Sequence, residues 1–213
     1  MIATQIQLDE LRELGAANLY HGNNDSGALD PGIKPIDPAM KLAGPALTVN
    51  VPAGDNLALH IAISRAAPGS VLVVDYKGHM EVAVTGDIMA LAALQRGLAG
   101  MVIDGAVRDA DEIARLGLPV FARGLSIRGP AKMGPGSVGN PVTLGHVVVH
   151  TGDIVVGDRD GVVVLPAEGW SEALDLARQR DAREEEVRRK LMAGETTVSL
   201  MGLSDDLIDI NMP

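Results

Sequence analysis

The chain has 213 residues, 46% of them hydrophobic, so it can bury a substantial core, and we expect a single domain. The formal net charge of −10 removes the long-range attraction to phosphate on which nucleic-acid binders generally depend, so we predict no nucleic-acid partner. The lack of cysteine excludes disulfides and a cysteine nucleophile. The lack of both a signal pattern and an apolar run of about 18–20 residues predicts a cytoplasmic protein without a membrane partner.

The first part of the chain alternates predicted helices and strands. Apolar residues at helical spacing predict a helix over residues 6–20, which the polar loop 22–27 ends. Asp55 is the predicted N-cap of the next helix. The elements that follow the first loop are a strand at 46–51, a helix at 56–66, a strand at 71–75, the segment 82–84 leading into a helix at 88–96, a strand at 101–104, a helix at 109–116 and a strand at 119–122. This alternation is typical of a layered α/β core with mainly parallel pairing.

The second part is predicted to be rich in strands. Residues 124–141 are rich in Gly, Pro and Ser and should form a long surface connection. Three valine-rich strands are expected at 147–149, 153–156 and 162–165, with a tight hairpin turn at 158–161. A charged helix should cover 169–193 and end at Gly194. The final twenty residues are predicted either to pack on a neighbouring subunit or to be mobile.

Asp87 stands where the N-cap of the helix at 88–96 is expected. The backbone N–H groups of Ile88 and Met89 would then point out of the helix start, with the positive end of the helix dipole behind them. Such a terminus can hold a small carboxylate or phosphate. The alternative is that Asp87 caps its helix and binds nothing.

Arg108 and Asp109 follow the strand at 101–104 through a predicted turn at 105–107, so both should lie at a strand's carboxyl end. Ligand crevices of α/β sheets open at that end. Arginine offers a planar fork suited to a carboxylate or to an oxygen gaining negative charge, and aspartate offers a hard oxygen ligand for Mg²⁺ or Mn²⁺. The sequence therefore indicates a small metal-dependent site. A surface ion pair, or Asp109 capping the next helix, is the alternative.

Several motifs occur in one order along most of the chain. They are residues 33–36, 44–49, 54–56, 68–73, 86–90, 100–109, 119–124 and 152–158. In this order they resemble the RraA-like class II pyruvate aldolases, which 4-hydroxy-4-methyl-2-oxoglutarate aldolase typifies. The resemblance implies a three-layer α/β fold called a swivelling domain, assembled into homotrimers or homohexamers with the active site between subunits. It places residues 169–213, the C-terminal helix and tail, at a subunit interface.

The resemblance also implies roles for individual residues. Asp109 would ligate a divalent metal cation, Mg²⁺ or Mn²⁺, and Arg108 would contact the keto oxygen and the carboxylate side of a pyruvyl group. The family uses an acidic residue from the C-terminal helix of an adjacent subunit, and counting back from Gly194 gives Glu184, with Glu185 and Glu186 as alternatives. At least two of these three are expected to be a solvated helix face paired with arginines. The residues expected to cradle the substrate are Gly86, Asp87, Ile88 and Met89.

The implied reaction is retro-aldol cleavage of a 4-hydroxy-2-oxo acid to pyruvate. Chelation by the metal would polarise the carbonyl, and Arg108 would stabilise the enolate. A metal-held water, positioned by Asp87 and Glu184, would take the proton of the C4 hydroxyl. Oxaloacetate decarboxylation passes through the same enolate and is expected as a second activity.

A non-enzymatic reading comes from the same family, whose regulator members bind and inhibit a ribonuclease. Asp109 favours the enzyme, because the bacterial regulator carries no acid at that position. Residues 197–202 depart from the aldolases, which commonly have a tyrosine before the glycine, so the subunit contacts made by the tail are in doubt. A Schiff-base mechanism would need a lysine, and Lys77 is the one reasonable candidate, but a loop charge explains this residue better. Arg123 ends a strand and is not expected to line the pocket.

Overall fold

The structure is a computed structural model that describes residues 3–209. A mixed sheet of eight strands forms its centre. The strand order is β1–β5–β4–β3–β2–β9–β10, and β6 pairs with β2. The strands are β1 Lys34–Pro35, β2 Leu42–Asn50, β3 Val71–His79, β4 Gly100–Val107, β5 Val120–Leu125, β6 Ser137–Val138, β9 Ile154–Gly157 and β10 Val162–Leu165. Strands β2 to β5 pair in parallel, and the other pairings are antiparallel. The predicted layered α/β core is confirmed.

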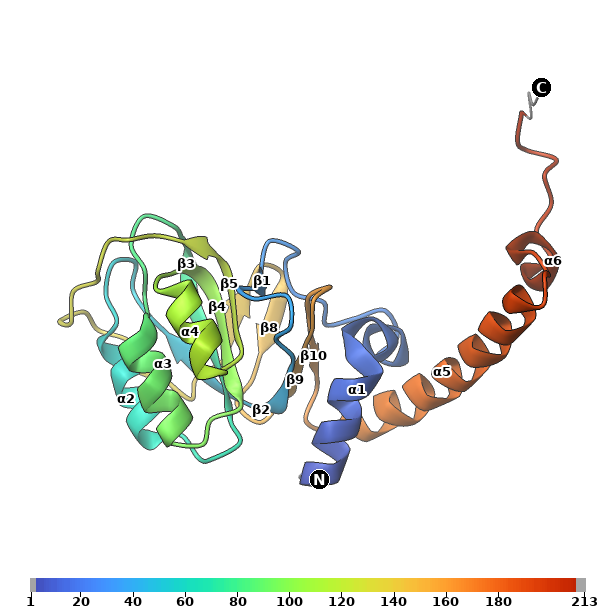
Figure 1. Ribbon diagram of the computed structural model, residues 1–213. Coiled ribbons are helices and arrows are strands. Elements are labelled where there is room, and N and C mark those ends of the chain that lie inside the picture. The colour runs from blue at the N-terminus through green and yellow to red at the C-terminus, as the bar shows by residue number, and fades with distance from the viewer. Residues whose placement is uncertain (1–2, 210–213) are drawn as a thin grey trace.

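Helices and a hairpin cover the two faces of the parallel strands. Helices α2 (Leu57–Arg65), α3 (Asp87–Gln95) and α4 (Ala110–Leu116) lie side by side on one face, and the β7–β8 hairpin (Val142–Leu144 and Val147–Val149) lies on the other (Figure 1). Because both faces are covered, the first halves of β3 and β4 are apolar without alternation, and Val71–Val74 is completely buried. Three layers result.

A second packing unit joins the two ends of the chain. Helix α1 (Gln5–Gly22) packs on β9, β10 and the first half of α5 (Trp170–Met192), with Trp170 buried between them. A capping box between Thr4 and Gln7 begins α1. The predicted C-terminal helix and the predicted hairpin turn at 158–161 are confirmed, whereas the helix predicted over 6–20 is broken at Gly15, whose φ of 80° and ψ of 164° are not helical.

The C-terminal part of α5 and the short helix α6 (Thr197–Met201) project away from the sheet (Figure 1). The side chains of Leu203, Leu207 and Ile208 are exposed. Packing of this segment on another subunit stays a prediction. No helix within residues 3–209 is long and apolar enough to cross a lipid bilayer.

Two predictions about strand ends were wrong. Strand β3 continues to His79 rather than ending at 75, and residues 105–107, predicted as a turn, continue β4 after a register irregularity. Gly105 is needed for close packing rather than for a turn, since a Cβ there would lie 2.6 Å from Tyr76 Cδ1. Residues 82–84 lead into α3, and the N–H of Val84 donates to the carbonyl oxygen of Ala106 in β4.

Candidate active site

Strand β4 carries Arg108 and Asp109 to the start of α4. Asp109 is the N-cap of α4 in a left-handed conformation, φ 57° and ψ 42°, which costs a residue with a side chain about 1–2 kcal/mol. Asp109 thus has the N-cap position that the alternative interpretation names, but within residues 3–209 its carboxylate makes no capping hydrogen bond. Asp109 Oδ2 lies 3.3 Å from Arg108 Nε, in the ion pair that the alternative also names, and 3.4 Å from the backbone nitrogen of Asp87. The backbone thus holds the carboxylate towards the start of α3.

Gly86, and not Asp87, is the N-cap of α3, so the predicted cap was one residue too late. Asp87 is the first residue of the helix, and its half-exposed carboxylate is free for other contacts because it makes no capping bond. A Cβ atom at Gly86 would lie 2.4 Å from Asp109 Oδ2 and 3.1 Å from Arg108 Nε. The missing side chain at Gly86 therefore lets the β4–α4 turn approach the helix terminus.

A cavity of about 170 Å³, called here the α3 cavity, opens beside this terminus. It is lined by residues 83–89, Arg108, Asn56, His60, Pro130 and Lys132. All four residues predicted to cradle a substrate line it together with Arg108, and Asp109 adjoins it through its contacts with Arg108 and Asp87. The two segments singled out from the sequence thus meet at one place, as the hypothesis requires.

Asn56, His60, Thr85 and Lys132 were not predicted. Three buried atoms of this group have no hydrogen-bond partner within residues 3–209, namely Asn56 Oδ1, Thr85 Oγ1 and His60 Nε2. Each such atom costs about 1–3 kcal/mol, so polar atoms left unpaired around a cavity mark a place where a ligand would be bound. Asn56 and His60 lie four residues apart at the start of α2, and this spacing could have identified them as one face of a helix. No motif or spacing in the sequence indicated that Lys132 would line the cavity.

The charge state of His60 follows from its surroundings. Burial lowers the pKa of its imidazole, and the nearby positive charge of Lys132 lowers the pKa further. His60 is therefore uncharged at neutral pH, and Arg108 and Lys132 are the cations of the α3 cavity.

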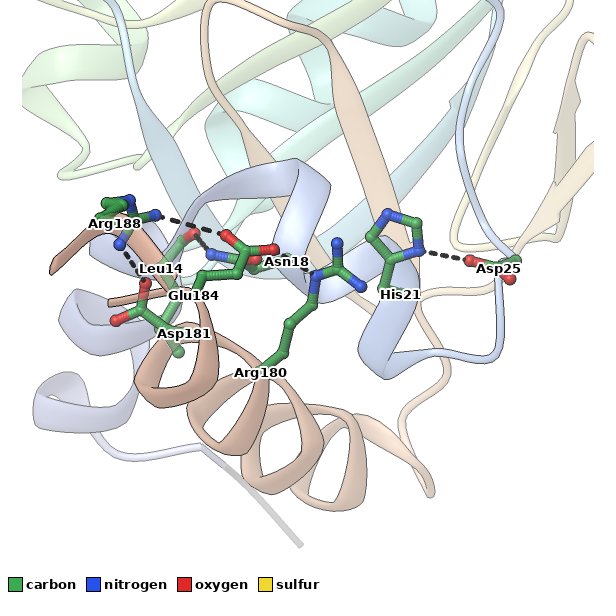
Figure 2. A network of polar contacts seen from close by, with 8 residues as sticks. All are labelled: Leu14, Asn18, His21, Asp25, Arg180, Asp181, Glu184 and Arg188. Carbon is green, nitrogen blue, oxygen red and sulfur yellow. Dashed lines mark hydrogen bonds and ion pairs between the residues drawn. The ribbon is translucent and has the colours of Figure 1, made fainter. Parts of the chain in front are cut away.

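Glu184 lies elsewhere in its own chain. It belongs to α5, on the side of the molecule away from α3 and α4 (Figure 1). Figure 2 shows its carboxylate between two arginines of the same helix, with Oε1 2.8 Å from Arg180 Nε and Oε2 3.3 Å from Arg188 Nη2. Glu185 and Glu186 also pair with arginines of α5, which agrees with their interpretation as a solvated helix face. A role for Glu184 at an adjacent subunit stays a prediction.

A second cleft, called here the β7 cleft, lies at the carboxyl ends of the same parallel strands. Its volume is about 570 Å³, and it is lined by β7 and by polar residues of four neighbouring strands. These are Asn50, which pairs with Asp75 across β2 and β3, and Asp104 and Arg123, which directly follow the regular pair Ile103–Ala122 of β4 and β5.

The charged groups of the β7 cleft pair with one another. The carboxylates of Asp75 and Asp104 are buried, Lys77 binds Asp75, and Arg123 binds Asp104 and Asp30. Burial by itself would lower the pKa of Arg123, but the hydrogen bonds to Asp30 and Asp104 outweigh it and raise the pKa. Arg123 thus lines a different cleft from Arg108, and Lys77 is held as an ion-pair partner.

Asp109 is the residue best placed to hold a divalent cation. Within residues 3–209 no three His, Asp or Glu side chains are grouped so that they could hold a metal ion. Mg²⁺ needs no such group, because it is commonly bound by one or two carboxylates, with substrate and water supplying the other oxygens. One partly exposed carboxylate beside the α3 cavity is compatible with such an ion.

The chain is similar to several known proteins. The model of the RraA-like family, described as Aldolase/RraA, matches residues 14–164. A protein of Halalkalibacterium halodurans, provisionally named 4-hydroxy-4-methyl-2-oxoglutarate aldolase, is 40% identical over 159 residues, which are 75% of this chain and 76% of the relative. An uncharacterized Pseudomonas syringae protein of known structure has 30% identity and a TM-score of 0.81, covering 92% of this chain and 96% of that one. A Streptomyces coelicolor protein described as an unusual member of the RraA family of ribonuclease ES inhibitors has 28% identity and a TM-score of 0.77, covering 88% and 98%.

Proposed function

Because the chain belongs to the RraA-like family, we propose that it is a lyase that cleaves 4-hydroxy-2-oxo acids of the 4-hydroxy-4-methyl-2-oxoglutarate type to pyruvate. The observation that carries this proposal is the meeting of Arg108 and the N-terminus of α3 at one small cavity, with the Asp109 carboxylate beside it. Binding, cleavage and proton transfer each have a candidate group there.

The pyruvyl carboxylate would lie at the N-terminus of α3. The backbone N–H groups of Ile88 and Met89 are available there, and the helix dipole favours a negative charge. The volume of about 170 Å³ favours a small acid over a drug-sized ligand. Lys132 supplies a second cation besides Arg108, which favours a substrate with a second carboxylate.

In the reaction the bond between C3 and C4 breaks. The C4 hydroxyl loses its proton and becomes a carbonyl, while the bonding electrons pass to the pyruvyl fragment as its enolate. The Arg108 guanidinium is 44% exposed, and Asp109 is its only side-chain partner within the described residues 3–209, so it can donate to the enolate oxygen as the negative charge there grows. The Asp87 carboxylate would position the water that takes the hydroxyl proton. Protonation at C3 then gives pyruvate.

A divalent cation, Mg²⁺ or Mn²⁺, would be held by Asp109 and would polarise the keto oxygen of the substrate. We also propose a homotrimer or homohexamer in which the projecting end of α5 brings Glu184 to the cavity of an adjacent copy. Glu184 would then exchange its contacts with Arg180 and Arg188 for contacts at that cavity.

The test is pyruvate release from a panel of 4-hydroxy-2-oxo acids, with and without a chelator. We expect release by the wild type, and loss of release on chelation and in Arg108→Ala and Asp109→Ala. Arg96→Ala is the matched control, since this exposed arginine lies at the other end of α3 and should leave release unchanged. Release that survives chelation or either substitution contradicts the assigned roles.

Oxaloacetate decarboxylation is a proposed second activity, because loss of CO₂ leaves the same enolate facing Arg108. It is tested by following CO₂ release from oxaloacetate with and without added Mg²⁺ or Mn²⁺. No metal-dependent release would remove it.

A second candidate function is inhibition of a ribonuclease, favoured by the likeness to the Streptomyces coelicolor protein described as a ribonuclease ES inhibitor family member. Adding the purified protein to a ribonuclease of that type tests it directly. Inhibition by a protein that cleaves none of the acids would favour the regulator over the lyase.

A further inference from the structure

Asp55 is a buried carboxylate that joins two segments at the edge of the α3 cavity. Its residue is 5% exposed and precedes Asn56, the N-cap of α2. One oxygen, Oδ1, accepts the N–H of Leu57 at 2.8 Å. The other, Oδ2, accepts the N–H groups of Met133 at 2.7 Å and Gly134 at 2.8 Å. A single side chain thus binds the start of α2 and a loop 78 residues later.

The backbone of the two segments is joined as well. The N–H of Ala131 donates to Gly54 O at 2.8 Å, and the N–H of Asn56 donates to Ala131 O at 3.0 Å. The loop also lies closely against Asp55, since a Cβ at Gly134 would be 3.0 Å from Asp55 Cγ. These contacts fix the loop at residues 131–134 on both sides of Lys132.

This loop forms a wall of the α3 cavity. Pro130 and Lys132 line the cavity from the loop, and Asn56 and His60 line it from α2. The loop also borders Arg108, because a Cβ at Gly129 would lie 3.1 Å from Arg108 Nη1. The segments that Asp55 joins therefore carry groups on two sides of the cavity.

We propose that Asp55 is a positioning residue that holds Lys132 over the α3 cavity, where Lys132 and Arg108 together bind a substrate with two carboxylates. The proposal rests on the proposed lyase function. Asp55 contacts no substrate itself and acts through the backbone N–H groups of Met133 and Gly134.

The chemistry of this contact requires a carboxylate. Both oxygens of Asp55 accept hydrogen bonds, whereas an asparagine amide has one accepting oxygen and one donating nitrogen. In Asp55→Asn either the α2 contact or the loop contacts must be lost, whichever way the amide turns. Burial alone would raise the pKa of the Asp55 carboxyl, but hydrogen bonds from the backbone N–H groups of Leu57, Met133, Gly134 and Asn56 hold its pKa below the usual value.

Asp153 offers a matched control. It is also buried, with 6% of the residue exposed, and it accepts the N–H groups of His150 at 2.8 Å and Ala167 at 3.0 Å. It does not line the α3 cavity. Asp153→Asn therefore removes the same kind of contact at another place in the fold.

The experiment compares Asp55→Asn, Asp153→Asn and the wild type by backbone hydrogen exchange and by steady-state kinetics with 4-hydroxy-4-methyl-2-oxoglutarate, which has two carboxylates. In Asp55→Asn we expect exchange at Met133 and Gly134 to rise at least tenfold and KM to rise at least tenfold, with kcat changed less than threefold. In Asp153→Asn we expect neither change. Unchanged exchange or KM in Asp55→Asn, or equal changes in both variants, would overturn the proposal.

Two further variants keep the test decisive if Asp55→Asn does not fold. Gly134→Ala disturbs the same contact from the loop and should raise both exchange and KM. Lys132→Met removes the charge but not the contact, so it should raise KM with exchange unchanged. A wild type that releases no pyruvate from any acid contradicts the proposed function, and hydrogen exchange then still decides whether Asp55 holds the loop.

Discussion

The α3 cavity and the β7 cleft lie at the carboxyl ends of the same parallel strands, yet their polar groups differ. Around the α3 cavity, Asn56 Oδ1, Thr85 Oγ1 and His60 Nε2 are buried without partners. In the β7 cleft each buried carboxylate already has a cation, Lys77 for Asp75 and Arg123 for Asp104. The position of a cleft in the sheet therefore does not by itself distinguish the two places. The unpaired neutral groups favour the α3 cavity as the candidate site.

The energetics of the two places explain this difference. A buried carboxylate without a partner costs several kcal/mol, so the β7 cleft needs its cations for stability. At the α3 cavity the polar atoms are neutral and their desolvation costs less, so they can stay unpaired until a ligand binds. Substitutions in the two places should consequently affect different properties, activity at the α3 cavity and stability at the β7 cleft.

Arg108→Ala should have the largest effect. Loss of the group that faces the enolate oxygen should lower kcat/KM for pyruvate release about 1000-fold, or about 4 kcal/mol. Its ion pair with Asp109 is partly exposed and contributes about 1 kcal/mol or less to folding, so urea denaturation should be nearly unchanged. A large loss of stability with retained activity would contradict the assignment of activity to the α3 cavity and of stability to the β7 cleft.

Arg123→Met tests the β7 cleft with the same type of residue. It leaves the buried Asp104 carboxylate without its cation, and we expect the free energy of unfolding to fall by about 3 kcal/mol. Pyruvate release by the folded variant should stay within threefold of wild type. If activity falls as far as in Arg108→Ala, the β7 cleft belongs to the active site and the comparison fails.

Gly86→Ala tests whether the approach of β4 to α3 creates the site. The added Cβ would meet Asp109 Oδ2 at 2.4 Å, so Asp109 and Arg108 must move. A displacement of about 1 Å can cost about 100-fold in rate, and we expect that loss in kcat/KM. Gly169→Ala is the control, because Gly169 has open space around its Cβ position and begins α5. Equal activity in the two variants would show that close approach at Gly86 is unnecessary.

Most of the sheet could be predicted because its strands are buried on both faces. Runs such as Val71–Val74 and Val162–Leu165 are apolar without interruption, and glycine or proline marks their ends. Gly105 misled the prediction because the sequence does not tell a turn glycine from one that makes room for Tyr76. That distinction depends on a neighbouring strand.

The candidate site was predictable where its residues are close in sequence to a helix start or a strand end. Gly86, Asp87, Arg108 and Asp109 have such places, and their meeting follows from the parallel order of the sheet. Lys132 and Asp55 could not be found in this way. Lys132 reaches the cavity through a loop whose position depends on hydrogen bonds to a residue 78 positions earlier, and no local pattern encodes such a contact.

Lowering the pH should have the smallest effect, and it distinguishes two aspartates by their surroundings. Asp55 braces the α3 cavity, while Asp30 is the more exposed partner of Arg123. The pKa of the Asp55 carboxyl is lowered, since its backbone hydrogen bonds outweigh burial, and the pKa of Asp30 is lowered chiefly by its hydrogen bond to Arg123. A carboxyl with a lowered pKa in the folded state stabilises the fold above its unfolded pKa of about 3.9. This stabilisation is lost as the pH falls through the lower, folded value.

Asp55→Asn should therefore lower the free energy of unfolding by about 2 kcal/mol at neutral pH, the scale of hydrogen bonds to a charged group. The difference from wild type should be constant above about pH 5 and should shrink below about pH 3.9. Asp30→Asn should show the same direction with a smaller difference, because solvent screens its ion pair. Urea denaturation of the wild type, Asp55→Asn and Asp30→Asn between pH 3 and pH 7 measures both differences in the free energy of unfolding. A difference for Asp55→Asn that does not change over this range would mean that the Asp55 contacts do not depend on its charge, and the brace of the α3 cavity would then be explained by packing alone.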